Sequence, residues 1–327
     1  MLITKTPYRI SFFGGGSDYP SWYLNHPGKV ISTTIDKYLY ITLKEPPIYS
    51  NSNYKISYRI TEHENDLKNI KHPIVREMLK YYKYKKGIDI NYDGDLPSKS
   101  GMGSSSSFVV GLMLAMQTLV DKKKLTKFSL AKKCVFFEQK ILKEIVGSQD
   151  QIAASYGGFN LLKFDKKKLF EINSFNKHNS FKKKLNSNLF LIYTGKQRRA
   201  HLVAKSYLNT LTNKNFNAIK SILQITSEAE KSIIKNKPDD FGKLLNDAWL
   251  IKKSLSNKVS NKQIDELYMQ GLNYGALGGK LLGAGGGGFI LFYVPEKNHK
   301  RFLNKFGKQK IVDFNFENNG SRVIYNN

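Results

Sequence analysis

The sequence PSKSGMGSSSS, residues 97–107, lies directly ahead of the apolar run Phe108–Val120. Small residues let a backbone close around an anion, and the N-terminus of a helix points unpaired N–H groups toward it. Serines are poor in a helix interior but favourable at its start, so we predict a loop over 98–103 and a helix from about Ser104 to Val120. Composition alone leaves two interpretations open, a phosphate-binding loop and an ordinary turn that caps a buried helix.

Two familiar phosphate motifs are excluded. No Gly-Lys-Ser/Thr stands where a Walker A loop needs it, and Ser106 occupies the third glycine position of a dinucleotide fingerprint. A second glycine cluster, 283–288, does fit G-x-G-x-x-G, but it follows a helical pattern and leads into the strand predicted at Phe289–Val294. The dinucleotide motif requires strand, glycines and helix in that order. We predict instead that these glycines allow two backbones to approach closely and support the loop at 97–107.

The length and pattern of the chain indicate two mixed domains. A chain of 327 residues fits about two domains of ~150 residues each. Strands and helices occur in both halves, which indicates an α/β or α+β protein. The Lys/Asn-rich stretch 173–187 is the expected boundary, giving domains 1–180 and 181–327. Strands are predicted at 3–13, 30–35, 38–43, 88–92, 188–194 and 289–294, and helices at 72–84, 126–145, 200–211, 216–236, 239–255 and 264–277.

The net charge of +27, from 53 Lys plus Arg against 26 Asp plus Glu, raises the hypothesis of a nucleic-acid-binding face. The lysines, however, are scattered from Lys5 to Lys310 in short clusters, and arginine, which is preferred for bidentate phosphate contacts, occurs only seven times. We interpret the charge mainly as solvated surface and expect no nucleic-acid partner. A positive field also suits an anionic small-molecule substrate.

No membrane span or disulfide framework is expected. The longest apolar run, Phe108–Val120, has 13 residues, fewer than the ~18 that suggest a spanning helix. The first 20 residues show no signal-peptide pattern, so we expect a cytoplasmic protein with no membrane partner. The single cysteine, Cys134, excludes a disulfide or a Cys-based zinc site within the chain, and we predict that it is a core thiol.

Two carboxylates are notable for their surroundings. Glu138 has Cys134 and Val135 before it, and Ile141 and Leu142 after it, at helical spacing. Burial of a carboxylate in such a stripe is costly unless it is paired or binds a cation. A salt bridge at the edge of the apolar face, a metal ligand and a partner for a buried lysine all stay open. Asp150 follows in a turn, where Asp most often caps a helix.

Three segments taken together resemble the GHMP kinases, the superfamily named for galactokinase, homoserine kinase, mevalonate kinase and phosphomevalonate kinase. In chain order, 6–19 (TPYRISFFGGGSDY) is similar to the sugar-binding motif, 97–107 to the ATP-phosphate loop, and 282–289 (LGAGGGGF) to the C-terminal glycine motif. The resemblance spans nearly the whole chain. It implies a two-domain α+β fold, with an N-terminal domain like domain 2 of ribosomal protein S5, a ferredoxin-like C-terminal domain, and the site between them.

The resemblance also implies roles for individual residues. Asp150 matches the catalytic Asp that orients or deprotonates the sugar hydroxyl, and Arg9 matches the basic residue that steadies it. Ser105 and Glu138 match the Mg²⁺ ligands, with Ser104 as an alternative to Ser105. The implied cofactors are therefore ATP and Mg²⁺. The matching ATP-binding residues are Pro97, Ser98, Lys99, Ser100, Gly101, Met102, Gly103, Ser104, Ser105 and Ser106.

The acceptor motif departs from the galactokinase form. Those members carry Gly-Glu-His-Thr-Asp-Tyr where this chain has GGGSDY, 14–19, and the extra glycines suit a bulkier or anionic substrate. This form, with STTIDKY at 32–38 and QDQ at 149–151, resembles the heptose 7-phosphate kinase branch. That branch phosphorylates the anomeric hydroxyl of D-glycero-α-D-manno-heptose 7-phosphate to the 1,7-bisphosphate, on the route to GDP-heptose for capsule, lipopolysaccharide or S-layer polysaccharide.

The expected acceptor site follows from that resemblance. A substrate with its own phosphate needs cations, and Arg198 and Arg199 are adjacent, although a solvated loop would also explain them. The expected substrate-binding residues are Gly14, Gly15, Gly16, Ser17, Asp18, Lys196, Arg198 and Arg199. The alternatives are a fucokinase- or galactokinase-like sugar-1-kinase, and a basic nucleic-acid-binding protein on a kinase-like scaffold. The oligomeric state is left open, with a homodimer as one assembly.

Overall fold

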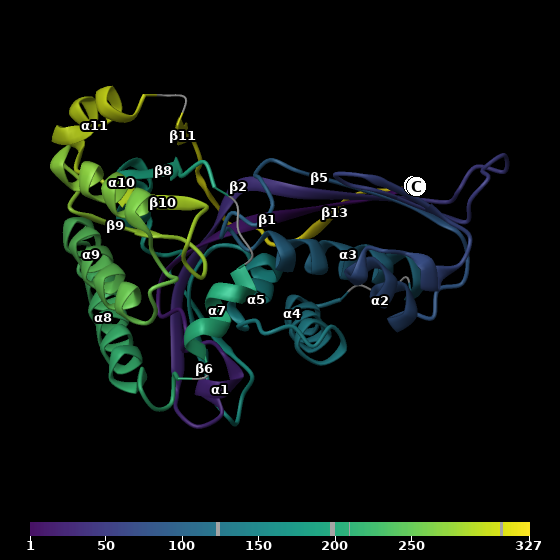
Figure 1. Ribbon diagram of the computed structural model, residues 1–327, viewed down its shortest axis with the longest axis horizontal. Helices are drawn as coiled ribbons and strands as arrows, with labels where there is room; N and C mark the ends of the chain where they lie inside the picture. The colour runs from purple at the N-terminus through teal and green to yellow at the C-terminus, as the bar shows by residue number, and fades with distance from the viewer. Residues whose placement is uncertain (122–124, 197–199, 209, 308–309) are drawn as a thin grey trace.

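Two antiparallel-rich sheets organise the chain in the computed structural model, which describes residues 1–121, 125–196, 200–208, 210–307 and 310–327 (Figure 1). The larger sheet runs in the order β13-β1-β2-β5-β3-β4, with β6 and β12 also paired to β2, and β7 paired to β6. Its strands are β1 (Leu2–Phe13), β2 (Gly28–Lys44), β3 (Tyr54–Ser57), β4 (Thr61–Glu64), β5 (Ile88–Gly94), β6 (Phe159–Phe164), β7 (Glu171–Ser174), β12 (Phe316–Glu317) and β13 (Arg322–Asn326). The smaller sheet runs β11-β8-β10-β9, with β8 (Leu189–Tyr193), β9 (Gly278–Leu281), β10 (Phe289–Tyr293) and β11 (Ile311–Val312).

The helices cover one face of each sheet. In Figure 1, α3, α4 and α5 lie along the larger sheet, whereas α8, α9 and α10 lie with the smaller one. The helices are α1 (Pro20–Tyr23), α2 (Pro73–Tyr81), α3 (Ser104–Asp121), α4 (Lys127–Phe136), α5 (Gln149–Tyr156), α6 (Asn179–Ser187), α7 (Ala200–Leu208), α8 (Phe216–Ile234), α9 (Pro238–Ser254), α10 (Lys262–Asn273) and α11 (His299–Phe306). This arrangement confirms the predicted α+β class.

The long strand β2 replaces two predicted strands, 30–35 and 38–43. Its first part pairs with β6 over 28–33, and its last part pairs with β5 over 39–44. The polar residues between those parts, Asp36 and Lys37, lie where the neighbouring strand changes, and both are only half-buried. The interruption in the apolar pattern therefore marks a change of partner and not the end of a strand.

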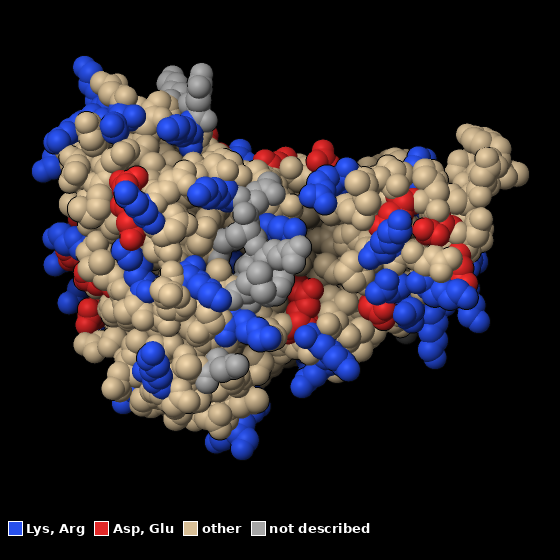
Figure 2. All heavy atoms as spheres, viewed as in Figure 1, with Lys and Arg blue, Asp and Glu red and all other residues tan. Residues whose placement is uncertain are grey.

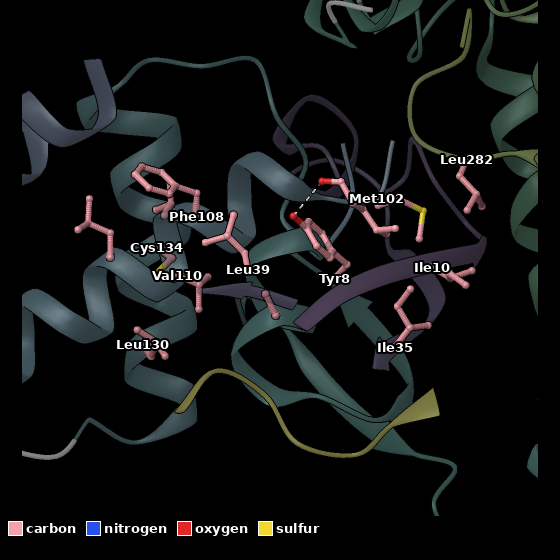
Figure 3. Close-up of a cluster of buried hydrophobic side chains, with 14 of the residues drawn as sticks. Tyr8, Ile10, Ile35, Leu39, Met102, Phe108, Val110, Leu130, Cys134 and Leu282 are labelled. Carbon is pink, nitrogen blue, oxygen red and sulfur yellow. Dashed lines mark hydrogen bonds between the residues drawn. The ribbon is translucent and has the colours of Figure 1, made fainter. Parts of the chain in front are cut away.

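The core joins α3 to the larger sheet and reaches both glycine segments. Tyr8, Ile10 and Leu39 of the strands lie with Phe108 and Val110 of α3 in one buried cluster (Figure 3). Leu130 and Cys134 of α4 belong to the same cluster, so the prediction of a core thiol is confirmed. Met102 from the first glycine segment and Leu282 from the second also enter it, and these two contacts anchor both segments.

The predicted helix 126–145 is too long. The chain changes to a π-helical turn at Phe137–Ile141 and leaves the helix at Leu142, whose N–H donates to the Phe137 carbonyl at 2.9 Å. Lys143 then adopts a positive φ of 54°, and Ile145 is exposed instead of facing the core. The helix ends early because residues 144–148 turn toward the site described below.

Two further expectations concern the domain boundary. The stretch 173–187 is not an irregular linker, since it contains the last residues of β7 and the helix α6, in which Phe181 and Leu185 are buried at i,i+4 spacing. The closing strands β12 and β13 return to β2 and β1 of the larger sheet. The division into 1–180 and 181–327 stays a prediction. The strands β12 and β13 of the second part pair with β2 and β1 of the first part.

The surface carries its positive charge widely. On the face shown in Figure 2, Lys and Arg side chains are dispersed over both halves of the molecule and do not form one continuous stripe. Across the described parts of the chain, no helix is both long and apolar enough to cross a bilayer.

Candidate active site

A cavity of about 550 Å³ draws its walls from both halves of the chain. One wall comes from β1, the turn after it and the N-terminal end of α3. A second comes from residues 144–150, and the rest comes from α7, α8, α9, β9 and the glycine segment at 283–284. Its charged lining groups include Arg9, Lys99, Lys280, Asp18 and Asp150. The cavity therefore brings together the predicted catalytic pair, Arg9 and Asp150, and part of the loop at 97–107, called the phosphate loop below. It also includes residues of the turn at 14–19, called the acceptor turn below.

The loop at 97–103 is attached to β1 and leads into α3 as predicted. Gly101 and Gly103 have φ values of 84° and 76°, which the chain needs in order to turn back on itself before the helix. The backbone N–H of Arg9 donates to the Met102 carbonyl at 3.1 Å. The Ser107 hydroxyl donates to the Pro7 carbonyl, also at 3.1 Å. These bonds fix the helix N-terminus beside Arg9, where its N–H groups favour a bound anion.

The predicted ATP-binding residues divide into two groups. Six of them line the cavity: Lys99, Gly101, Gly103, Ser104, Ser105 and Ser106. Met102 points into the core, and Ser100 is buried with its hydroxyl lacking a hydrogen-bond partner in the described structure. Pro97 and Ser98 do not line this cavity. Within the loop, Lys99, Gly101 and Gly103 line the cavity, whereas the alternate residues Ser100 and Met102 are buried.

The second glycine segment packs directly on the first, as the sequence predicts. A Cβ on Gly283 would lie 2.6 Å from the Cα of Gly101, and a Cβ on Gly288 would lie 2.1 Å from the carbonyl oxygen of Ser100. Only glycine allows these two backbones to approach so closely. The motif that imitates a dinucleotide fingerprint is therefore a support for the phosphate loop.

We expect Gly283→Ala to raise the KM for ATP about tenfold or more and to destabilise the fold by about 2–4 kcal/mol. The added methyl would clash with Gly101 and push the loop away from the anion. Gly307→Ala is the matched control, because Gly307 has the same φ of 69° but no atom within 4 Å of the position of a Cβ. The control should cost about 1–2 kcal/mol of stability and leave the KM for ATP unchanged. Equal ATP kinetics in the two variants, measured by steady-state assay, would contradict the supporting role.

Arg9 and Asp150 form a bidentate ion pair at the centre of the cavity. Arg9 Nε donates to Asp150 Oδ1 at 2.7 Å and Nη2 donates to Oδ2 at 2.8 Å, while Nη1 donates to the Gly101 carbonyl at 2.7 Å. The Arg9 side chain is 6% exposed and that of Asp150 is 24% exposed, so the carboxylate keeps access to the cavity. One guanidinium thus connects the phosphate loop to the predicted catalytic carboxylate.

Glu138 is fully buried, and the serine that contacts it is Ser106. The Ser106 hydroxyl reaches both carboxylate oxygens, at 3.1 and 2.9 Å, and Gln151 Nε2 also donates to Oε2. Burial, the largest cause, raises the pKa of Glu138 well above its usual value. Of the alternatives open at the sequence level, an ion pair with a lysine is not formed among the described residues.

The serine in contact with Glu138 is Ser106, and the assignment of Ser105 as a Mg²⁺ ligand stays a prediction. The sequence paired Glu138 with Ser105, or with Ser104 as the alternative, but Ser105 is exposed and Ser104 is half-buried. Successive residues of a helix are rotated by about 100°, so only Ser106 lies on the face of α3 that meets Glu138. The residues fit a magnesium site: carboxylate and hydroxyl oxygens are ligands that Mg²⁺ takes, and Gln151 Oε1 is buried beside them with no partner in the described structure.

The acceptor turn surrounds Asp18. Asp18 Oδ1 accepts from the Gly16 N–H at 3.0 Å, and Oδ2 accepts from Gln149 Nε2 at 2.9 Å. Gly147 packs on the carboxylate so closely that a Cβ there would lie 1.9 Å from Oδ2. Burial, followed by the charge of Asp150, raises the pKa of Asp18 to about 6.

The remaining predicted acceptor residues behave differently. Gly14, Gly15 and Gly16 line the cavity, but Ser17 does not, since its hydroxyl donates to the carbonyls of Gly14 and Lys29 and closes the turn. Lys196 is exposed, and its backbone carbonyl accepts from the Gly288 N–H at 2.9 Å. Arg198 and Arg199 lie outside the described residues.

Lys280 and Gln149 are among the cavity residues to which sequence reasoning gave no role. Gln149 Nε2 holds Asp18, as described above, while Gln149 Oε1 is buried without a partner in the described part of the chain. Lys280 is buried in β9 and belongs to the cavity lining. A signal was present, because Lys280 is the only charged residue between Tyr274 and Tyr293.

Comparison with known proteins identifies both halves of the chain. The family model described as GHMP kinases N terminal domain matches residues 69–158, and the one described as GHMP kinases C terminal matches 229–311. The chain is 28% identical to D-glycero-alpha-D-manno-heptose 7-phosphate kinase of Campylobacter jejuni, over 98% of this chain and 97% of that protein. It is also 28% identical to mevalonate kinase of Methanocaldococcus jannaschii, over 96% and 98%. A D-glycero-D-manno-heptose 1-phosphate kinase structure from Bacteroides thetaiotaomicron superposes with a TM-score of 0.79 at 22% identity, covering 100% of both chains, and shows the same fold.

Proposed function

The chain belongs to the GHMP kinase family, and we propose that it is an ATP- and Mg²⁺-dependent kinase of the anomeric hydroxyl of D-glycero-α-D-manno-heptose 7-phosphate. The observation that carries the proposal is the Arg9–Asp150 pair, which lies between the phosphate loop and the acceptor turn. The full-length similarity to a heptose 7-phosphate kinase supports the choice of sugar. The relatives also include galactokinases and mevalonate kinases, so phosphoryl transfer is common to the set.

Phosphoryl transfer requires positioning and charge neutralisation more than covalent chemistry. Asp150 orients the acceptor hydroxyl and receives its proton as the oxygen bonds to the γ-phosphorus of ATP, while the bond from that phosphorus to the β–γ bridging oxygen breaks and ADP leaves. Arg9 holds the Asp150 carboxylate in a fixed orientation and offsets negative charge as it develops. The N–H groups at the start of α3 hold the phosphate chain. When bound, Mg²⁺ neutralises phosphate charge, and Glu138 with Ser106 would hold it.

The acceptor side fits a polyhydroxyl compound. Asp18 Oδ2 accepts from Gln149 Nε2, Gln149 Oε1 has no partner in the described structure and can accept a further hydrogen bond, and the backbone of the Gly14–Gly16 turn lines the cavity without side chains. These groups would hold sugar hydroxyls while the C1 hydroxyl faces Asp150. The 1,7-bisphosphate product, its place on the route to GDP-heptose for surface polysaccharide, a cytoplasmic location and a homodimer as one assembly belong to the same proposal.

A substrate panel tests this function. The purified protein is incubated with MgATP and with heptose 7-phosphate, unphosphorylated heptose, galactose, fucose and mevalonate, and ADP release is measured. The proposal expects the highest kcat/KM with heptose 7-phosphate. Turnover of galactose or fucose without turnover of any sugar 7-phosphate would instead support the alternative sugar-1-kinases. Tight, steeply salt-dependent binding to random RNA with no kinase activity would support the nucleic-acid-binding alternative.

Asp18→Asn should lower kcat/KM for the acceptor about 10–100-fold at pH 7.5, because a charged acceptor of a sugar hydroxyl is lost. It should also stabilise the protein at that pH. A carboxyl whose pKa rises from 3.8 to about 6 on folding favours the folded state below pH 4, and this contribution, about 3 kcal/mol, is lost as the pH rises through 6. We therefore expect the melting temperature of the variant to exceed that of wild type at pH 8, with the difference disappearing near pH 4. If the variant is less stable than wild type at pH 8, the ionised Asp18 carboxylate does not destabilise the folded protein, and the expectation is wrong.

A further inference from the structure

Lys280 is a buried lysine among the residues that line the cavity. It lies in β9, where all four residues are buried, and is 6% exposed. Its Nζ donates to the Phe12 carbonyl at 2.6 Å, and this is its one hydrogen bond within the described structure. An ammonium has three N–H donors, so two remain for a group inside the cavity.

Among the described residues, no carboxylate is paired with this charge. Two carboxylates of the cavity lining already have partners, since Asp150 is paired with Arg9, and Asp18 accepts from Gly16 and Gln149. No ion pair to Lys280 is formed by any described residue. Burial, followed by the charge of Arg9, lowers the pKa of Lys280 to about 7. A buried cation of this kind is stabilised by an anion that enters the cavity.

A buried polar group without a partner in the described structure, the Ser11 hydroxyl, belongs to a residue of the same cavity lining. Ser11 follows Arg9 by two residues on β1, so the two side chains lie on the same face of the strand. The Ser11 hydroxyl lines the cavity, is buried, and has no hydrogen-bond partner among the described residues. Lys280 Nζ bonds to the carbonyl of the next residue, Phe12, and Lys280, Ser11 and Arg9 all line this cavity.

We propose that Lys280 and Ser11 bind phosphate oxygens in this cavity. An ammonium with two unused N–H donors, a hydroxyl donor and the adjacent Arg9 match the negative charge and the several acceptor oxygens of a phosphate group. The inference rests on the proposed function, which supplies two sources of such a group: the phosphate that the acceptor already carries, and the phosphoryl group in transfer. Recognition of the acceptor's own phosphate would then not depend on the region of Arg198 and Arg199 alone.

The test compares Lys280→Met, Lys280→Arg and Ser11→Ala with Lys243→Met, in which an exposed lysine of α9 is changed. Methionine keeps the length of the side chain and removes a buried charge, so the melting temperature should stay equal or rise. Each protein is assayed with heptose 7-phosphate and with unphosphorylated heptose, and the rise in melting temperature on addition of orthophosphate or heptose 7-phosphate is measured without ATP. We expect Lys280→Met to lose at least tenfold in kcat/KM, Ser11→Ala to lose about threefold to tenfold, Lys280→Arg to recover part of the loss, and the control to match wild type.

The pattern of the loss identifies the source of the phosphate. A higher KM confined to the phosphorylated acceptor, with a smaller thermal shift by heptose 7-phosphate, assigns Lys280 to the acceptor's own phosphate. An equal fall in kcat with both acceptors assigns it to the transferred phosphoryl group. Kinetics within threefold of wild type on both acceptors, with unchanged thermal shifts, would overturn the inference. If wild type turns over no sugar phosphate, the proposed function fails separately, and the comparison is made with the acceptor that is used and with orthophosphate.

Discussion

Replacement of Asp150 by Asn should lower kcat for the acceptor about 10²–10⁴-fold, which is the range that a positioned proton acceptor contributes. Asn has nearly the same shape, but it cannot take the proton of the sugar hydroxyl. It also presents an N–H₂ group to Arg9, which donates to both oxygens of Asp150 in wild type at 2.7 and 2.8 Å. Arg9 should therefore shift toward its remaining partner, the Gly101 carbonyl.

Binding of ATP separates this loss from unfolding. The phosphate loop is attached to the backbone of β1 through Arg9 N–H and Ser107, and these bonds do not involve Asp150. We expect the Kd for ATP, measured by calorimetry, to stay within a few-fold of wild type. Asp313→Asn, an exposed aspartate of the C-terminal region, is the control and should leave kcat unchanged. A kcat for Asp150→Asn within a few-fold of wild type would show that another group receives the proton.

Glu138→Gln should give the second largest effect, with activity and stability changing in opposite directions. If Glu138 and Ser106 hold Mg²⁺, loss of the charged ligand should lower kcat about 10²–10³-fold and raise the Mg²⁺ concentration needed for half-maximal rate. The same change removes a carboxylate that is fully buried beside two polar side chains, Ser106 and Gln151, and that forms no ion pair with any described residue. The protein without ligands should therefore become more stable at pH 8, by about 1–3 kcal/mol.

The sign of the pH dependence follows from the raised pKa of Glu138. A carboxyl that holds its proton more tightly in the folded state favours folding at low pH, and that contribution is lost as the pH rises. The stabilisation of Glu138→Gln should hence be large at pH 8 and small at pH 4, as measured by thermal or urea unfolding. Glu296→Gln, on an exposed turn, should change neither quantity. A variant that loses stability at pH 8, or that keeps its Mg²⁺ dependence, would exclude Glu138 as a buried metal ligand.

Local physics explains why the loop and the helix after it could be predicted. Serine and glycine are favoured at the start of a helix, and the apolar run after Ser107 is stabilised by burial in the core. The helix α3 therefore begins at Ser104, as expected. The end of the next helix could not be predicted in the same way. After the π-helical turn at Phe137–Ile141 the chain leaves helical geometry, and Gly147 then packs on Asp18, more than a hundred residues earlier in the chain. Helix propensity contains no information about that contact.

The sequence by itself determined the order of the three glycine-containing motifs, the α+β class and the residues from which the catalytic pair is drawn, because each depends on residue type and short-range spacing. The tertiary structure decided which atoms meet. It paired Arg9 with Asp150 across 141 residues, selected Ser106 over Ser105 through the rotation of α3, and brought Lys280 from β9 into the same cavity. These outcomes depend on the packing of β1, α3 and β9, which are far apart in the sequence. The free energy of such contacts depends on two distant segments together, so a local sequence pattern does not contain it.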